Sequence, residues 1–249
     1  MKTIHKLLAL ALCLALLCGA VSATMRETGT SGLKLADEVS YTHTSWSNDQ
    51  KEGQYLQEHT LTYTAGGAVR PMVVYGDTLS GRSPMNYTAK FLEDKDLVLV
   101  AGVNGSFFDM NNGIPYGLIV TEGILRSSGN ISSIGFFADG KTVIGTPELK
   151  VTATIGGTEQ EIFYNKALTR DNGIGLYSRD YDTATKSSLK SYNVVLQPLS
   201  GKAELTMTGT LSATVRAVQD KTASCDIPED CFVLAIAEDS RYASALDTM

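Results

Sequence analysis

The sequence predicts a β-rich α+β domain with a mixed or antiparallel sheet and few helices. Short runs rich in β-branched residues recur along the chain, and glycine-containing turns separate them. No long stretch has the apolar spacing of an amphipathic helix. The composition, 43% hydrophobic and 19% charged, is that of a globular protein rather than a disordered or fibrous one.

The expected elements follow the chain in order. The runs expected to form strands are Leu61–Thr64, Pro71–Tyr75, Leu97–Val103, Leu118–Thr121, Lys150–Ile155, Asn193–Leu196 and Cys231–Ile236. The turns between them are expected at Gly66-Gly67, Gly76-Asp77, Asn112-Gly113, Asp139-Gly140 and Gly156-Gly157. The better helical candidates are Ser83–Glu93 and the last residues from Asp239.

The N-terminus has the pattern of a secretory signal peptide. Lys2 and Lys6 precede the apolar run Leu7–Leu17, and small residues at 21–23 offer a cleavage site. The run is short for a membrane helix, although an uncleaved anchor is the other interpretation. We expect residues 1–23 to be removed and the protein to be secreted or held in the cell envelope, with no membrane span after removal. Residues 24–94 are expected to form a leader, loose up to Asp37, and a β-rich region, and residues 95–249 the main domain.

Charge and missing motifs exclude several functions. The formal net charge is −6, and phosphate backbones are held by excess Lys and Arg, so a nucleic-acid partner is not expected. After the signal only His43 and His59 remain, without metal-ligand spacing, and both are expected to be exposed. No G-x-S-x-G elbow or phosphate-binding glycine loop occurs. No metal or cofactor is therefore expected.

Two cysteines follow the signal. Cys225 and Cys231 are six residues apart with Pro228 between them, and in an oxidising compartment they could close a short disulfide loop. Two unrelated thiols are the other interpretation. We expect the disulfide.

One segment stands out as a candidate site. The apolar run that ends at Val103 leads into Asn104-Gly105-Ser106-Phe107-Phe108-Asp109. Gly105 allows close approach of a ligand, Asn104 and Asp109 offer polar groups, and the two phenylalanines could form apolar walls. The same residues also fit a hairpin turn with two core phenylalanines.

The segment resembles the signature of the phosphodiester glycosidase family, related to N-acetylglucosamine-1-phosphodiester α-N-acetylglucosaminidase. Members carry Asn-Gly-x-Phe-Phe after an apolar strand, then a glycine turn, a short strand and a Gly-x-x-x-Ser-Ser-like stretch. Here residues 104–108, 117–120 and 122–128 occupy those places. Weaker likeness at 134–140, 168–181 and 227–234 extends the resemblance over about residues 95–240. The family's Asp-Gly-Arg turn and terminal Asn-Leu-Asp-Gly-Gly-Gly-Ser motif do not occur, so we expect a member that is incomplete at its C-terminus.

The resemblance implies hydrolysis of a sugar-1-phosphodiester, which releases the sugar from phosphate, if the C-terminal part is present. It makes Asp109 and Asn104 the catalytic candidates. The implied substrate-binding residues are Gly105, Ser106, Phe107, Phe108 and Arg126. Arg126 could meet a phosphate bidentately, although a surface role is the other interpretation. The implied partner is a carbohydrate phosphodiester or a cell-envelope glycan.

Other interpretations stay open. Glu122 and Asp139 are secondary carboxylate candidates, and each also fits a solvated turn. A non-catalytic secreted domain that binds carbohydrate or cell envelope would need the same turns and aromatic residues, and a purely structural surface domain is the third possibility. Whether Asn104 and Asp109 line an open cleft separates the last of these from the others.

Overall fold

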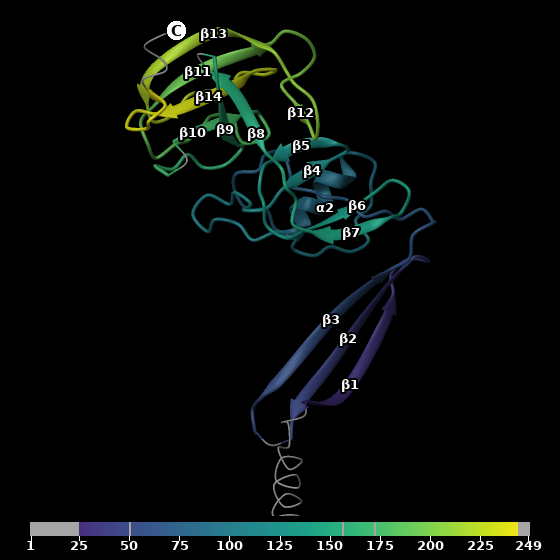
Figure 1. Ribbon diagram of the computed structural model, residues 1–249. Coiled ribbons are helices and arrows are strands. Elements are labelled where there is room, and N and C mark those ends of the chain that lie inside the picture. The colour runs from purple at the N-terminus through teal and green to yellow at the C-terminus, as the bar shows by residue number, and fades with distance from the viewer. Residues whose placement is uncertain (1–24, 50, 156, 172, 244–249) are drawn as a thin grey trace, which may run out of the picture. The chain divides into compact units, whose positions relative to one another are not determined.

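The computed structural model describes residues 25–49, 51–155, 157–171 and 173–243 (Figure 1). The chain divides into two compact units, residues 1–70 and residues 71–249. The boundary expected at residue 94 lies inside the second unit. Backbone hydrogen bonds from Leu79 to Asp180 and from Ser80 to Tyr181 tie this early segment to the later chain. The proposed signal peptide lies outside the described residues.

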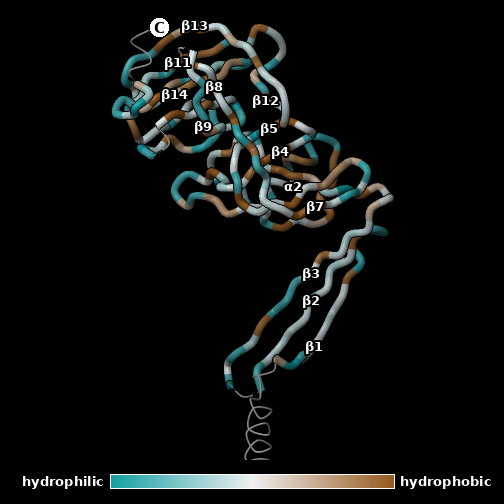
Figure 2. Tube along the Cα trace, viewed as in Figure 1, coloured by the Kyte–Doolittle hydropathy of each residue, from teal (hydrophilic) through white to brown (hydrophobic). Residues whose placement is uncertain are grey.

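The described part of the first unit is a three-stranded antiparallel sheet in the order β1-β2-β3. Its strands are β1 (Met25–Lys34), β2 (Val39–Asn48) and β3 (Tyr55–Tyr63). The expectation of a loose leader up to Asp37 was wrong, because β1 pairs along its length with β2 despite having every side chain exposed. Figure 2 shows mostly white and teal positions on these strands, with isolated brown ones. Backbone pairing rather than burial therefore defines this strand.

The two histidines face each other across this sheet. His43 and His59 are paired in register, with ring centroids 4.7 Å apart, and the Tyr41 hydroxyl lies 2.7 Å from His59 Nδ1. His59 is exposed, as expected, whereas His43 is half-buried because it lies on the central strand. Among the described residues no group of three metal-ligating side chains forms.

A six-stranded mixed sheet forms the main body of the second unit, in the order β13-β11-β14-β10-β9-β8. Only β9 and β10 pair in parallel. The strands are β8 (Val151–Ile155), β9 (Thr158–Tyr164), β10 (Ile174–Tyr177), β11 (Ser191–Pro198), β13 (Ala213–Thr222) and β14 (Phe232–Ala237).

The core of this unit lies on both faces of the sheet. Every residue of β14 is buried, and alternate side chains enter two different core clusters, as the twofold period of a strand requires. One cluster receives Val233, Ala235 and Ala237, and the other receives Phe232, Leu234 and Ile236.

Smaller elements complete the second unit. β4 (Ile119–Thr121), β5 (Ile124–Ser127) and β12 (Leu205–Thr206) form a three-stranded sheet, and β6 (Ser133–Phe136) pairs with β7 (Thr142–Gly145). The single α-helix of the described residues is α2 (Met85–Glu93), and its one buried residue is Leu92. The turn from β4 to β5 places both Glu122 and Gly123 at positive φ, a geometry that suits a tight two-residue hairpin.

The β-rich fold predicted from the sequence is confirmed. The runs at 61–64, 118–121, 150–155 and 231–236 lie within one residue of strand bounds, 193–196 lies inside β11, and the helix expected at Ser83–Glu93 corresponds to α2. The described residues from Asp239 on form turns instead of a helix. No described helix has both the length and the apolar character needed to cross a membrane.

Two expected strands were wrong. Pro71–Tyr75 and Leu97–Val103 run without strand pairing, and Val98 and Val103 are more than 80% exposed. A strand forms only where a neighbour accepts and donates its backbone hydrogen bonds, and a run of apolar residues does not reveal whether that neighbour exists.

Candidate functional site

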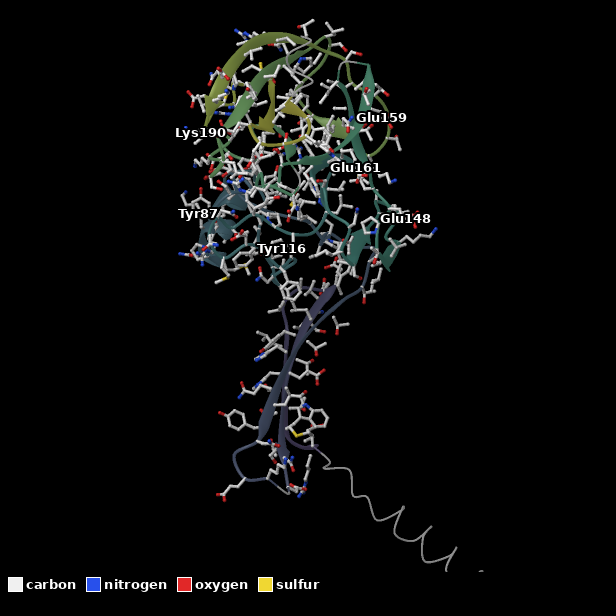
Figure 3. All side chains as sticks on the ribbon, turned by 60° about the vertical axis from the view of Figure 1, so that its left-hand side comes forward. Tyr87, Tyr116, Glu148, Glu159, Glu161 and Lys190 are labelled. Carbon is white, nitrogen blue, oxygen red and sulfur yellow. The ribbon has the colours of Figure 1, made fainter. Side chains whose placement is uncertain are left out.

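The segment singled out by the sequence forms an irregular hairpin, residues 107–116, which we call the motif hairpin. The Tyr116 N–H donates to the Phe107 carbonyl at 2.9 Å, and the Asp109 N–H donates to the Ile114 carbonyl at 2.9 Å. Phe108 forms a β-bridge with Pro115 between these two bonds. Tyr116, labelled in Figure 3, is exposed.

Asp109 holds the turn of this hairpin. Its carboxylate accepts from the Asn111 N–H at 2.8 Å and from Asn112 Nδ2 at 3.4 Å, and its carbonyl accepts from the Gly113 N–H. Gly113 is required there, because φ is 79° and a Cβ would lie 1.9 Å from the Gly81 carbonyl oxygen. Both carboxylate oxygens are thus already engaged in local structure.

The other motif residues are exposed or half-buried. Asn104 and Gly105 are exposed, and Phe107 is 82% exposed, so Phe107 forms no apolar wall. Phe108 is half-buried. Ser106 donates to the Phe107 carbonyl at 2.9 Å and lies against Gly117.

Arg126 lies at the centre of a different cluster. Its Nη1 lies 3.0 Å from Asp180 Oδ2 and 3.3 Å from Glu204 Oε1, and its Nε donates to Thr121 Oγ1 at 2.8 Å. The Tyr75 hydroxyl donates to Asp180 Oδ1 at 2.8 Å. These residues come from β4, β5, the turn after β10, the residue before β12 and the unpaired segment at 71–75. The fold therefore assembles the cluster from five separated parts of the chain.

Partial burial of this cluster shifts the pKa values of its side chains. The side chains of Arg126 and Asp180 are 16% and 18% exposed, whereas Glu204 is 36% exposed. Burial lowers the pKa of Arg126, but the hydrogen bond to Asp180 and the charges around it outweigh this and raise the pKa overall. Burial first, and then the charge and hydrogen bond of Asp180, raise the pKa of Tyr75. Tyr75 therefore stays a neutral hydrogen-bond donor to Asp180 at physiological pH.

Asn165 connects the two main partners of the cluster. It is fully buried at φ 52°, and its Nδ2 donates to the Arg126 carbonyl at 2.7 Å and to Ser178 Oγ at 2.9 Å. Its Oδ1 accepts from the Ser178 N–H at 2.9 Å, and Ser178 Oγ accepts from the Asp180 N–H at 3.3 Å. One amide side chain thus fixes the backbone of β5 against the turn that carries Asp180.

The cluster opens into a pocket of about 120 Å³, which we call the Arg126 pocket. Its lining combines three cationic and three anionic side chains. These are Arg126, Arg179 and Lys202, with Asp180, Glu204 and Asp230. Arg179 is anchored by a bond from its Nη1 to the Ile227 carbonyl at 3.1 Å. A site of this kind can receive a phosphate group while it holds carboxylates nearby.

Arg126 is the one candidate from the sequence that lines this pocket. Asn104 to Asp109 are not among its lining residues. The two secondary carboxylates lie in turns. Glu122 lies in the β4–β5 turn, and Asp139 accepts from the Lys141 N–H at 3.0 Å within its own turn. Sequence reasoning missed Tyr75, Asp180 and Glu204 as site residues. The sequence did contain a signal for Asp180. This residue comes shortly after a buried strand, and it lies in the segment 168–181, which carries part of the resemblance.

Lys166 contacts the C-terminal end of the motif hairpin. Its Nζ donates to the Pro115 carbonyl and, at 3.0 Å, to the Gly117 carbonyl. Burial lowers the pKa of Lys166 to about 7 from its ordinary 10.5. The folded protein therefore releases this proton at a lower pH than the unfolded chain does.

Replacing Lys166 by methionine is expected to change how stability depends on pH. Between pH 7 and pH 10.5 the unfolded chain binds more protons at this lysine than the folded protein does, so the wild type gains stability as pH rises through that window. Below pH 7 Lys166 is protonated in both the folded and the unfolded state, and the folded protein carries the full free-energy cost of burying its charge. Urea unfolding of both proteins at pH 6.5 and 9.5 measures the effect. Equal pH slopes for the two proteins would contradict it.

The two cysteines are buried and not joined in this structure. Cys225 Sγ donates to the Asp226 carbonyl at 3.3 Å, and Cys231 Sγ lies 3.4 Å from Gln197 Oε1. Burial raises the pKa of Cys225, which disfavours the thiolate. The expected bridge is not formed in this structure, where each thiol has its own hydrogen-bond partner, and the disulfide stays a prediction for the exported protein.

No family model matches the chain, and no curated protein and no solved structure matches it either. The resemblance to phosphodiester glycosidases therefore rests on the sequence motifs alone.

Proposed function

We propose that this protein, with its C-terminal part present, is an exported hydrolase of sugar-1-phosphodiesters, which releases the sugar from phosphate at the Arg126 pocket. The observation that carries the proposal is the position of Arg126 Nη1 between two carboxylates, with Arg179 and Lys202 on the same lining. The guanidinium and the neighbouring cations suit the phosphate. The carboxylates suit the positive charge that develops at the anomeric carbon.

The state of the carboxylates favours a phosphate leaving group over an ordinary sugar alcohol. A glycosidase that expels an alcohol needs a protonated carboxyl group to donate to the leaving oxygen. Asp180 and Glu204 each accept a hydrogen bond from the Arg126 guanidinium, so the oxygens in these contacts offer no proton to a leaving group. An alkyl phosphate is acidic, with a second pKa of about 6, and leaves without protonation when cations stabilise it. This chemistry matches the residues present.

The two carboxylates are close together. Asp180 Oδ2 and Glu204 Oε1 lie within 3.0 and 3.3 Å of the same nitrogen, so these oxygens are at most 6.3 Å apart. Retaining glycosidases hold their carboxyl groups about 5–5.5 Å apart, whereas inverting enzymes need about 6.5–9.5 Å to admit a water molecule. The nearest oxygens of the two groups thus lie closer than the inverting range, and on that basis we propose a retaining mechanism.

In this mechanism Asp180, held by Tyr75 and Arg126, attacks the anomeric carbon. The bond from that carbon to the phosphate oxygen breaks, and its electron pair stays on the phosphate. Glu204 then takes a proton from the water that attacks the same carbon, and the Asp180–sugar ester breaks to restore the carboxylate. Asp109 and Asn104, the catalytic candidates of the sequence, have no step in this scheme.

Hydrolysis of the α-linked methyl phosphodiester of N-acetylglucosamine tests the proposal. The wild type is expected to release methyl phosphate and the α-anomer of the sugar first, which NMR follows directly. Asp180→Asn and Glu204→Gln are each expected to lower kcat at least 100-fold, because each removes a group that acts on the reacting carbon. Asp239→Asn is the matched control, since Asp239 pairs with Arg170 at an exposed position. Absence of hydrolysis by the protein with its C-terminal part present would overturn the function, and first release of the β-anomer would overturn the role of Asp180.

A non-catalytic carbohydrate- or envelope-binding domain is the second candidate. The observation that favours it is the pocket's small volume together with an arginine that already has two carboxylate partners. In that case the same phosphodiester binds without turnover, and calorimetry with the wild type distinguishes the two candidates.

A further inference from the structure

Two asparagine–glycine pairs of the second unit lie in different local structures. Asn104-Gly105 and Asn112-Gly113 are eight residues apart, and the structure describes both pairs in full. An asparagine that precedes glycine can react with its own backbone, because glycine has no side chain to shield its amide nitrogen. The reaction requires that this nitrogen reach the side-chain carbonyl carbon in the geometry of attack. The surroundings of each pair therefore decide whether it reacts.

The structure leaves Asn104 and Gly105 unconstrained. Both residues are exposed, and they follow the run Leu97–Val103, which has no strand pairing. Among the described residues, none forms a hydrogen bond with the Asn104 side chain or with the Gly105 N–H. Apart from the adjoining residues, no described atom lies within 4 Å of the place that a Cβ at Gly105 would take. The backbone bonds of the motif hairpin begin only at Phe107, so the pair can turn without breaking them.

The hairpin turn holds the reacting groups of Asn112 and Gly113. Asn112 Oδ1 accepts from the Ile114 N–H at 2.9 Å, and Asn112 Nδ2 donates to Asp109 Oδ2 at 3.4 Å. The Gly113 N–H donates to the Asp109 carbonyl at 2.8 Å. Gly113 is also buried, at φ 79° and directly against the Gly81 carbonyl. Attack by the Gly113 nitrogen would break these three bonds, so the turn protects Asn112.

The reaction at the unconstrained pair needs only water as a co-reactant. The Gly105 nitrogen attacks Asn104 Cγ, and the new C–N bond closes a cyclic imide. The side-chain nitrogen leaves as ammonia and takes with it the proton that the Gly105 nitrogen has lost to solvent. Water then opens one of the two C–N bonds of the imide. Opening at the side-chain carbonyl leaves aspartate at position 104, and opening at the backbone carbonyl leaves isoaspartate, whose main chain runs through the side-chain carbons.

We propose that Asn104 is a site of spontaneous, irreversible deamidation and that Asn112 is protected from the same reaction by the motif hairpin. The modification adds a negative charge at the first residue of the motif. As isoaspartate it also lengthens the main chain just before the hairpin. The proposal does not depend on the proposed function, because the reaction requires neither a phosphodiester nor a catalytic group of the protein.

Ageing of the wild-type protein in mildly alkaline buffer tests the proposal. Samples taken over time are cleaved at Asp109, which lies between the two pairs, and analysed by peptide mass spectrometry against a sample taken at the start. Deamidation changes the peptide mass by the difference between water and ammonia, and electron-transfer fragmentation locates it and identifies isoaspartate. Asn104 is expected to react at least about tenfold faster than Asn112, because the turn holds Asn112 away from the geometry of attack. An Asn112 rate equal to or above that of Asn104 would overturn the proposal.

The same measurement in urea shows whether the fold causes the difference. Unfolding removes the bonds of the turn, so Asn112 is expected to accelerate until the two asparagines react at similar rates. A ratio that stays the same in urea would contradict the proposal, because the local sequence and not the structure would then set it.

A single variant tests the attacking nitrogen. Gly105→Ala places a methyl group beside that nitrogen and narrows the backbone freedom of the pair. It is expected to slow the reaction of Asn104 about tenfold and to leave the rate of Asn112 unchanged. Gly145→Ala is the matched control, because it makes the same change at an exposed glycine with open space around it and no preceding asparagine, and it should alter neither rate. If Asn104 reacted as fast in Gly105→Ala as in the wild type, attack by the Gly105 nitrogen would be refuted.

Discussion

Replacing Asn165 by alanine is expected to lower the free energy of unfolding of the second unit by about 2–6 kcal/mol. The change removes the partners of two buried backbone groups, the Arg126 carbonyl and the Ser178 N–H. A buried polar group left without a partner costs about 1–3 kcal/mol. Loss of the amide also frees the Asp180 turn from β5, so activity per folded molecule should fall with stability.

Asn165→Gly separates this effect from backbone strain. Asn165 has φ 52°, which alanine tolerates less well than asparagine and which glycine adopts freely. If the lost amide is responsible, alanine and glycine should destabilise to a similar degree. Urea unfolding followed by near-UV circular dichroism of the tyrosines is the suitable measurement, because eight of the eleven tyrosines lie in the second unit, whereas the single tryptophan, Trp46, lies in the first. A loss below about 1 kcal/mol in both variants would show that water replaces the amide.

Arg126→Met is expected to lower kcat/KM for the methyl phosphodiester by about 100- to 1000-fold, the cost of removing a preorganised group that stabilises transition-state charge. The variant removes the cation between Asp180 and Glu204 and leaves those two carboxylates facing each other. Stability should fall by about 1–3 kcal/mol, because the pair with Asp180 is largely buried. Activity is therefore expressed per folded molecule.

Two further variants make this result specific. Arg126→Lys keeps the charge but cannot contact Thr121 and both carboxylates with one planar group, so it should recover only part of the activity. Arg170→Met removes an arginine from an exposed ion pair of the same unit and should leave activity unchanged. If Arg126→Met cleaved the methyl phosphodiester as fast as the wild type, the Arg126 pocket would not be the active site.

Particular elements show how much of the fold could be read from the sequence. β14 was predictable because six consecutive apolar residues buried on both faces give an unambiguous run. β1 was not, because its stability comes from pairing with β2 and its side chains are polar and exposed. The run at Leu97–Val103 has the composition of a strand and no strand pairing, so composition failed where pairing decides the outcome.

The candidate site divides in the same way. Arg126 could be predicted because it lies in a short, glycine-bounded motif. Its partners could not, because Tyr75, Asp180 and Glu204 lie far from it along the chain and meet it only through the packing of separate elements. Asp109 was predicted because it lies beside the motif, and in the structure its carboxylate fixes the hairpin turn by accepting from the Asn111 N–H and the Asn112 amide. Proximity in sequence placed Asp109 beside the motif but outside the lining of the Arg126 pocket, and its catalytic role stays a prediction.

The equal numbers of cationic and anionic side chains around the Arg126 pocket have a kinetic consequence. They cancel at a distance, while the whole chain carries a formal net charge of −6. An approaching phosphodiester is thus repelled by the distant field and attracted only within about one Debye length, about 8 Å at physiological ionic strength. Added salt screens the repulsion before it weakens the sheltered contacts, so association should become faster as ionic strength rises. The sign is opposite to that of proteins which draw anions in with a basic surface.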